Sequence, residues 1–453
     1  MARTAAWVCD LTYEALPPRV VDLAKACVLD QIGVQIFGAT LAHAQAPYRM
    51  VQAMGAAPES TIAFHGTRTV APYAACVNAV FASGCELDDG NPAAGHGGSP
   101  VIPTTLAFAE LRGCSGRDIV RAVVAGYQVM AHVGIPIRLG MHRGGWHGVK
   151  VLGVFGAAAA ASTMLGLGHE QTAHAIAIAA SEASGTTEYD RVRPEWRRGE
   201  AHPCRRRRSV RCASSPARVR RAHRPGTAFD GWRGVLRVFG AAAPFEAPED
   251  IGARFHIEDN IFKLQPAVGT VHAAVEAIEV LPRTSGFPID RIDDIVRINV
   301  GVVDCAVADG GHISRPTDAL SAQFSLAFSV ALRLVRGRNA VQDYLDPGNW
   351  TDPSLLAVAD KVICHATVFE PGAPELGATV SLRMADGRVL EHYQRAFRDH
   401  SSDPATSDDL ERKFHVPVDG LIERDAADEI VDFVGRLDEA SDVNRLFRVM
   451  TRA

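Results

Sequence analysis

The chain has 453 residues, a formal net charge of −5 at pH 7 and 47% hydrophobic residues. This length exceeds one typical hydrophobic core and predicts two domains, while the weak negative charge gives no overall case for binding nucleic acid or an anionic membrane. Nine scattered cysteines, never spaced as Cys-x-x-Cys, argue against a disulfide framework, a zinc site and an iron–sulfur motif.

The first part of the chain predicts helices. It also predicts a cytoplasmic protein, because no signal-peptide pattern is found. Met1–Asp10 lacks the basic-then-apolar layout of a signal peptide. Apolar residues recur at helical spacing over Arg19–Phe37, and a second helical segment, Ala71–Gly84, follows.

A loop rich in Gly and Pro then carries a concentration of polar side chains, namely Glu86, Asp88, Asp89 and His96. Ser99 suits a helix N-cap, Pro100 suits the first helical position, and Val101–Leu111 continues at helical spacing. The N–H groups of Gly97, Gly98 and Ser99 could therefore hold a carboxylate, beside which His96 could act as an acid or a base. The alternative is a polar loop that caps an ordinary helix.

A second histidine, His147, stands at the entrance of the apolar segment Val149–Leu167. This segment approaches the length of a membrane span. It consists largely of Ala, Gly and Ser, with Lys150 near its start and no aromatic belt, so it favours a tightly packed core helix over a membrane helix. His169–Gly185 predicts a further helix.

Residues 191–224 differ from the rest of the chain. They contain thirteen arginines, no lysine and no apolar periodicity. A basic nucleic-acid arm, a solvated insertion and a stretch translated out of frame are three interpretations. A nucleic-acid arm would interleave aromatic residues with the arginines, and this stretch holds only Trp196. Out-of-frame translation of GC-rich DNA is the favoured interpretation, because well-patterned sequence adjoins both edges. We expect the segment to be displaced and disordered, because burying so many arginines is costly.

The remainder alternates between strands and helices, which predicts an α+β module. Lys263 and His272 flank a turn and a helix start and could face one pocket. The other predicted elements are strands over Ile292–Val303, Val362–Val368, Ala378–Met384 and Arg388–Tyr393, a helix over Ala319–Arg336, and helices from Thr406 to the end.

Several motifs, in their order and spacing, resemble the MmgE/PrpD (2-methylcitrate dehydratase) family over most of the chain. The matching residues are Val28–Gly33, Glu86–His96 with Ser99–Pro103, Trp146-His147, Leu165–Leu167, Phe262-Lys263 with His272, Ala322–Ser325 and Lys413-Phe414. The resemblance implies a mostly helical domain, residues 1–265 completed by 401–453, and a smaller α+β lid domain, residues 266–400. It also implies a homodimer whose site lies between the domains and needs neither metal nor organic cofactor.

The family likeness further implies a lyase that acts on a small di- or tricarboxylate, with removal of water from 2-methylcitrate as the first expectation. Alternatives are decarboxylation of cis-aconitate and epimerisation of iminodisuccinate. By this resemblance His96 is the leading acid/base, Glu86 and Asp89 orient it or shuttle protons, and His147, Lys263 and His272 bind carboxylates. Such chemistry needs a base at the carbon next to a carboxylate, an acid for the leaving group and cations for the developing charge.

The chain departs from the family pattern at three places. Glu86 stands where most members have aspartate, and Phe328 stands where members commonly have tyrosine. The Lys-Arg-x-His-x-Gly segment, which supplies a substrate-binding lysine, should fall within residues 191–224 and is absent. A non-catalytic or damaged homologue is therefore a second hypothesis, and nucleic-acid binding through the arginines is a third.

Overall fold

The structure is a computed structural model, and its chain folds into two compact units. The helical unit comprises Met1–Gly84, Asp88–Phe262 and Ser407–Ala453, and the α/β unit comprises Cys85–Leu87 and Lys263–Thr406. The structure describes residues 2–187, 227–240, 251–252, 254–286, 289–370, 376–398 and 404–452. The prediction for residues 191–224 lies outside the described residues.

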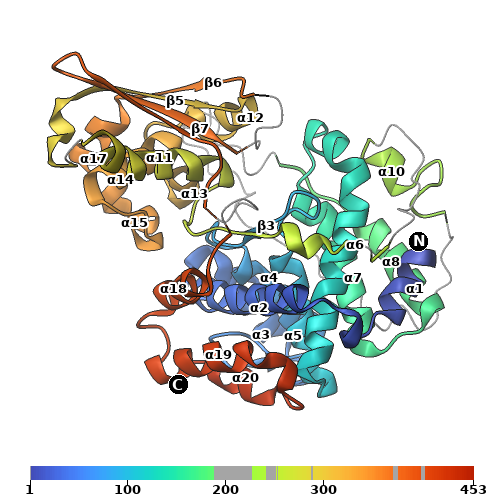
Figure 1. Ribbon diagram of the computed structural model, residues 1–453. Coiled ribbons are helices and arrows are strands. Elements are labelled where there is room, and N and C mark those ends of the chain that lie inside the picture. The colour runs from blue at the N-terminus through green and yellow to red at the C-terminus, as the bar shows by residue number, and fades with distance from the viewer. Residues whose placement is uncertain are drawn as a thin grey trace. The chain divides into compact units, whose positions relative to one another are not determined.

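Long apolar helices build the helical unit (Figure 1). Its helices are α1 (Ala2–Asp10), α2 (Pro18–Gly38), α3 (Gln45–Met54), α4 (Ala71–Ala82), α5 (Gly98–Arg112), α6 (Gly116–Arg143), α7 (Gly148–Leu165), α8 (His169–Glu182), α10 (Val235–Val238), α18 (Ser407–Val418), α19 (Arg424–Gly435) and α20 (Asn444–Val449). The unit also has two short antiparallel strand pairs. Strand β1 (Ser60–Thr61) pairs with β2 (Arg68–Thr69), and β3 (Asp89–Gly90) pairs with β4 (Ile261–Phe262).

Helix α7 is a core helix of this unit. It packs against α5, α6 and α8, and small residues such as Gly153 and Gly156 allow the close approach, since a Cβ on Gly156 would lie 2.6 Å from the Met130 side chain. By length and composition α7 and the Gly116–Arg138 part of α6 could cross a membrane, yet 67% and 83% of their apolar windows are buried within the protein. This burial agrees with the predicted packed helix.

The end of the chain returns to the helical unit, where α18 packs on α2 (Figure 1). The two helices are separated by most of the sequence. The hydrophobic contact between them includes Phe414, which is 1% exposed and lies close against Gly33, where a Cβ would be 2.9 Å from its ring. Glycine at position 33 therefore makes room for the returning segment.

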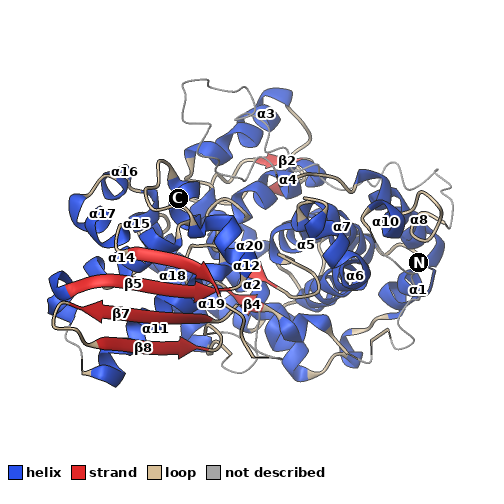
Figure 2. Cartoon of the chain, turned by 90° about the horizontal axis from the view of Figure 1, so that it is seen from above, coloured by secondary structure: helices blue, strands red, loops and turns tan. Residues whose placement is uncertain are grey.

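The α/β unit contains a four-stranded sheet of order β6-β5-β7-β8 (Figure 2). Strands β5 and β6 are parallel, and the other neighbouring pairs are antiparallel. Its elements are β5 (Ile295–Val302), β6 (Val362–Ala366), β7 (Ala378–Met384), β8 (Val389–Gln394), α11 (Gly269–Ser285), α12 (Asp304–Ala306), α13 (Ala319–Phe324), α14 (Leu326–Arg336), α15 (Val341–Leu345), α16 (Pro347–Trp350) and α17 (Pro353–Ala359).

Side chains alternate across this sheet as expected for one covered face. Val380 and Leu382 of β7 are buried, whereas Arg383 is exposed. Helix α11 packs on β7 and β8, and α14 packs on β6. The prediction of a mostly helical protein with an α+β second domain is thus confirmed.

Two predicted helix boundaries were wrong. Helix α5 begins at Gly98 with Gly97 as its N-cap, so Ser99 lies inside the first turn and is not the cap. The predicted helix over Ala319–Arg336 is broken at Ser325, whose hydroxyl accepts the Phe328 N–H and caps a new helix. Serine competes with the backbone for N–H groups, which explains the break.

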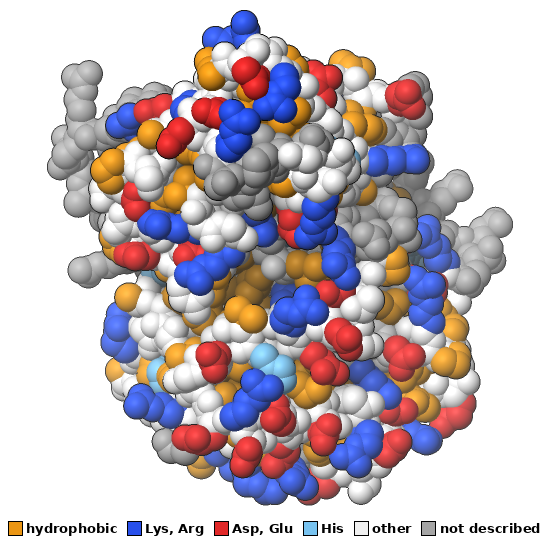
Figure 3. Space-filling model, turned by 60° about the vertical axis from the view of Figure 1, so that its left-hand side comes forward, with side chains coloured by type: hydrophobic (Ala, Val, Ile, Leu, Met, Phe, Trp, Pro, Cys, Tyr) orange, Lys and Arg blue, Asp and Glu red, His pale blue; other side chains and the backbone are white. Residues whose placement is uncertain are grey.

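Basic and acidic side chains are interspersed on the face in Figure 3. This mixture fits the small net charge of the chain.

Candidate functional site

The loop predicted to carry the site begins with a short strand, β3, that pairs with β4. Strand β3 pairs antiparallel with β4, with Asp89 opposite Phe262 and Gly90 opposite Ile261. These residues are far apart in sequence, and the pair fixes the backbone of Asp89 at the start of the loop that carries His96.

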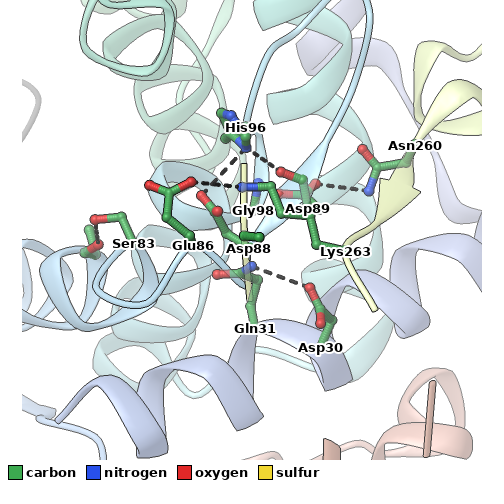
Figure 4. A network of polar contacts seen from close by, with 12 residues as sticks. Asp30, Gln31, Ser83, Glu86, Asp88, Asp89, His96, Gly98, Asn260 and Lys263 are labelled. Atoms are coloured by element: carbon green, nitrogen blue, oxygen red, sulfur yellow. Dashed lines mark hydrogen bonds and ion pairs between the residues drawn. The ribbon is translucent and has the colours of Figure 1, made fainter. Parts of the chain in front are cut away.

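Asp89 is the centre of a buried polar network (Figure 4). Its Oδ1 accepts the Gly98 N–H at 2.8 Å, while its Oδ2 accepts the Tyr127 hydroxyl at 2.5 Å and the Asn260 amide at 2.8 Å. Burial raises the pKa of Asp89, and these hydrogen bonds oppose that rise. The side chain has no exposed surface, and its predicted part in orienting His96 or shuttling protons stays a prediction.

This network corrects the expectation for the helix start. The Gly98 N–H, predicted to bind a substrate carboxylate, is occupied by the protein's own Asp89 carboxylate. Gly97 is packed against Tyr127, and Ser99 is 2% exposed. The positive end of α5 therefore stabilises an internal anion.

His96 is placed by the same loop and remains accessible. Its Nδ1 lies 2.5 Å from the Asp89 backbone oxygen and 3.6 Å from Asp88 Oδ2, and its side chain is 37% exposed. A carbonyl oxygen only accepts hydrogen bonds, so this contact assigns the proton to Nδ1 in the neutral ring. The Nε2 lone pair is then available to take a proton, as the predicted acid/base role requires.

Glu86 and Lys263 form an ion pair within the α/β unit. Lys263 Nζ lies 3.1 Å from Glu86 Oε2, and Lys263 is 4% exposed. Glu86 has φ of +53°, a left-handed conformation that is uncommon for residues other than glycine and clusters at functional sites. A backbone held in this way fits a residue whose side chain must point to a fixed partner.

Gln323 joins the two segments that carry this ion pair, a role that the sequence analysis did not assign. Its amide nitrogen donates to the backbone oxygens of Cys85 at 2.6 Å and Pro266 at 3.1 Å. The motif around Ala322–Ser325 contained this residue, and its amide among apolar neighbours was the available signal.

The remaining predicted histidines have different surroundings. His272 is 1% exposed, with Nε2 3.1 Å from the Ala267 backbone oxygen and its ring edge-on to Phe397. His147 is the N-cap residue of α7, as the predicted helix entrance implied, and its backbone N–H donates to Gly185 at 3.0 Å. Their binding of substrate stays a prediction.

Among the described residues, no group of three or more His, Cys, Asp or Glu side chains is arranged to hold a metal ion.

The sequence analysis also missed Tyr127 and Asn260, which contact Asp89. Tyr127 lies in an apolar helix where a buried tyrosine needs a partner for its hydroxyl, and that need was the available signal.

Comparisons with known proteins give the family. The MmgE/PrpD N-terminal domain matches residues 2–248, and the MmgE/PrpD C-terminal domain matches residues 266–439. The chain is 25% identical to the cis-aconitate decarboxylase-like protein oryM of Aspergillus oryzae, covering 98% of this chain and 96% of that protein. It is 24% identical to the cis-aconitate decarboxylases of Aspergillus terreus (98% and 94% covered) and Mus musculus (97% and 91% covered). The chain therefore belongs to the MmgE/PrpD family, and its matched relatives are lyases.

Proposed function

We propose that this chain is a lyase that decarboxylates cis-aconitate or a closely similar unsaturated tricarboxylate. The observation that carries the proposal is full-length similarity to relatives named cis-aconitate decarboxylases. The sequence analysis placed this reaction second to dehydration of 2-methylcitrate, and similarity to these relatives supports placing it first in the proposal.

The chemistry assigns distinct tasks to the residues. Decarboxylation breaks the carbon–carbon bond to a carboxylate, which leaves as CO2, and the electron pair left on the substrate must be stabilised and then receive a proton. His96 would first take a proton from solvent at Nε2 and then, as the imidazolium, give it from Nε2 to the substrate, since Nδ1–H is held by the Asp89 carbonyl oxygen. Lys263, with Glu86 as its partner, would bind a carboxylate that remains on the substrate.

Dehydration of 2-methylcitrate is the second candidate. It is supported by the same histidine, because removal of water requires a base near a substrate carboxylate and an acid for the leaving hydroxyl.

We also propose that the enzyme is a homodimer that works without metal or organic cofactor. Light scattering after size exclusion and assay after EDTA treatment test these two points.

The deciding experiment incubates the purified full chain with cis-aconitate, 2-methylcitrate and citrate in parallel, and follows CO2 release and products by mass spectrometry. We expect CO2 from cis-aconitate, with release by H96Q lowered about 10²–10⁴-fold. Water loss from 2-methylcitrate without CO2 from cis-aconitate would instead establish the dehydratase. No product from any of the three would reject both reactions and favour a non-catalytic homologue.

A further inference from the structure

One residue, Asp89, joins both ends of the loop that carries His96. Its backbone oxygen lies 2.5 Å from His96 Nδ1, and its Oδ1 accepts the N–H of Gly98, where α5 begins. The position of the imidazole ring therefore depends on how firmly Asp89 itself is held.

Two donors from outside the loop hold the Asp89 carboxylate. Tyr127, in the middle of α6, donates its hydroxyl to Oδ2 at 2.5 Å, and Asn260, just before β4, donates its amide to the same oxygen at 2.8 Å. The Asn260 amide also lies 3.3 Å from Cys27 Sγ. Both donors come from buried parts of the helical unit, since Tyr127 is 0% and Asn260 7% exposed.

Tyr127 also contacts the other end of the loop. A Cβ on Gly97 would lie 2.4 Å from Tyr127 Cε1, so the ring packs directly on the backbone beside His96. Burial and the neighbouring Asp89 charge raise the pKa of Tyr127 well above its ordinary value. The hydroxyl consequently keeps its proton at neutral pH and can act as a permanent donor.

We propose that Tyr127 is a positioning residue that, together with Asn260, fixes Asp89 and thereby holds His96 as the Nδ1–H tautomer with Nε2 free for proton transfer. A neutral imidazole in water favours the other tautomer, so the protein must supply the preference. Asp88 Oδ2, 3.6 Å from the same nitrogen, is a second acceptor that also requires the proton on Nδ1. Without the Tyr127 hydroxyl the loop loosens, and the ring turns away from both acceptors into water, where the Nε2–H tautomer is preferred.

The test compares Y127F with Y344F in the full chain. Tyr344 is a matched control in the α/β unit, since it is also fully buried and its hydroxyl donates to Ser329 at 3.0 Å. Both variants lose one buried hydroxyl and should lose similar stability. The readout is the 15N spectrum of histidine-labelled protein at pH 8, with the His96 signals identified by their disappearance in H96Q.

We expect wild type and Y344F to show Nδ1–H for His96, and Y127F to shift toward the Nε2–H tautomer. This measurement needs no substrate, so it decides the inference even where the proposed function fails. The kinetic arm rests on that proposed function: Y127F should lower kcat for cis-aconitate about tenfold to a hundredfold with KM little changed, whereas Y344F should not.

A His96 tautomer unchanged in Y127F would overturn the proposal, even if the melting temperature fell. If Y127F does not fold, the same spectrum is recorded for N260A. This variant removes the second donor to Asp89 Oδ2 and leaves the tyrosine ring in place. The same tautomer shift in N260A supports the proposal, and an unchanged spectrum rejects it.

Discussion

Lys413 Nζ lies 2.5 Å from Asp30 Oδ1, and both side chains are almost fully buried, at 3% and 1% exposed. The ion pair joins α18, near the end of the chain, to α2 near its start. Lys413 also lies 5.7 Å from the centre of the Phe262 ring, and Phe262 pairs with Asp89 in the β3–β4 ladder. The returning segment is thus attached directly beside the strand pair that supports the loop carrying His96.

Removing the lysine of this pair should be costly. K413M leaves the Asp30 carboxylate buried without its cation, and we expect the free energy of unfolding to fall by about 3–5 kcal/mol. The double variant D30N/K413M should recover part of this loss because no uncompensated charge remains. Urea denaturation followed by circular dichroism measures both.

A surface pair provides the control for that experiment. Arg315 and Asp360 form an ion pair at 57% and 45% side-chain exposure, and R315M should leave the free energy of unfolding nearly unchanged because solvent screens the pair. Equal losses for K413M and R315M would contradict a special contribution of the buried pair.

The buried His132 should make stability depend on pH. Burial, aided by the neighbouring His256 charge, lowers its pKa from 6.5 to about 4. Below pH 6.5 the unfolded chain binds a proton that the folded protein does not accept, so stability falls as the pH drops toward 4. The full effect is on the order of 3 kcal/mol. Asp30 acts in the opposite sense, because its pKa is raised to about 6 in the folded protein and its protonation favours folding as the pH falls.

The difference between wild type and H132Q isolates this contribution. Because Asp30 affects both proteins equally, the free energy of unfolding of wild type relative to that of H132Q should fall as the pH drops from 7 to 5. Parallel curves would show that His132 does not carry the effect.

Substitution of His96 should remove the acid/base group while leaving the fold intact, because its side chain is partly exposed. We expect H96Q to lower kcat by about 10²–10⁴-fold. The exposed His169, which pairs with Asp10 at 2.8 Å, provides the control H169Q, and its activity should match wild type. Steady-state kinetics with cis-aconitate measure both, and retained activity in H96Q would exclude His96 as the acid/base.

Lys263 should act on binding more than on turnover. A charged hydrogen bond contributes about 1.5–3 kcal/mol, so K263M should raise KM by roughly tenfold or more. K361M, a lysine change in the same unit, should leave KM unchanged. A lowered kcat with unchanged KM would instead place Lys263 in the chemical step.

The gene across codons 186–228 offers a further test. We expect another reading frame to restore a helical sequence with Lys-Arg-x-His-x-Gly, and the restored chain to bind carboxylate substrate more tightly through the added lysine. Resequencing followed by parallel assays of both chains measures this. Confirmation of the present frame would favour the non-catalytic homologue.

The sequence alone determined the helical first domain, the sheet strands and the family, because apolar periodicity and motif order are local properties of the chain. It also singled out His96 and Lys263, whose residue types and surroundings carry chemistry. The helix start at Gly98 and the break at Ser325 escaped prediction, since both depend on which acceptor a particular N–H group finds.

Only the tertiary structure decided what each carboxylate does. Asp89 and Glu86 look alike in sequence, yet Asp89 is buried among Tyr127, Asn260 and Gly98, whereas Glu86 pairs with Lys263. The physical reason is that a buried charge must be satisfied by donors, and folding brings those donors from distant segments of the chain. Burial and partner choice are properties of the assembled core, which local sequence does not specify.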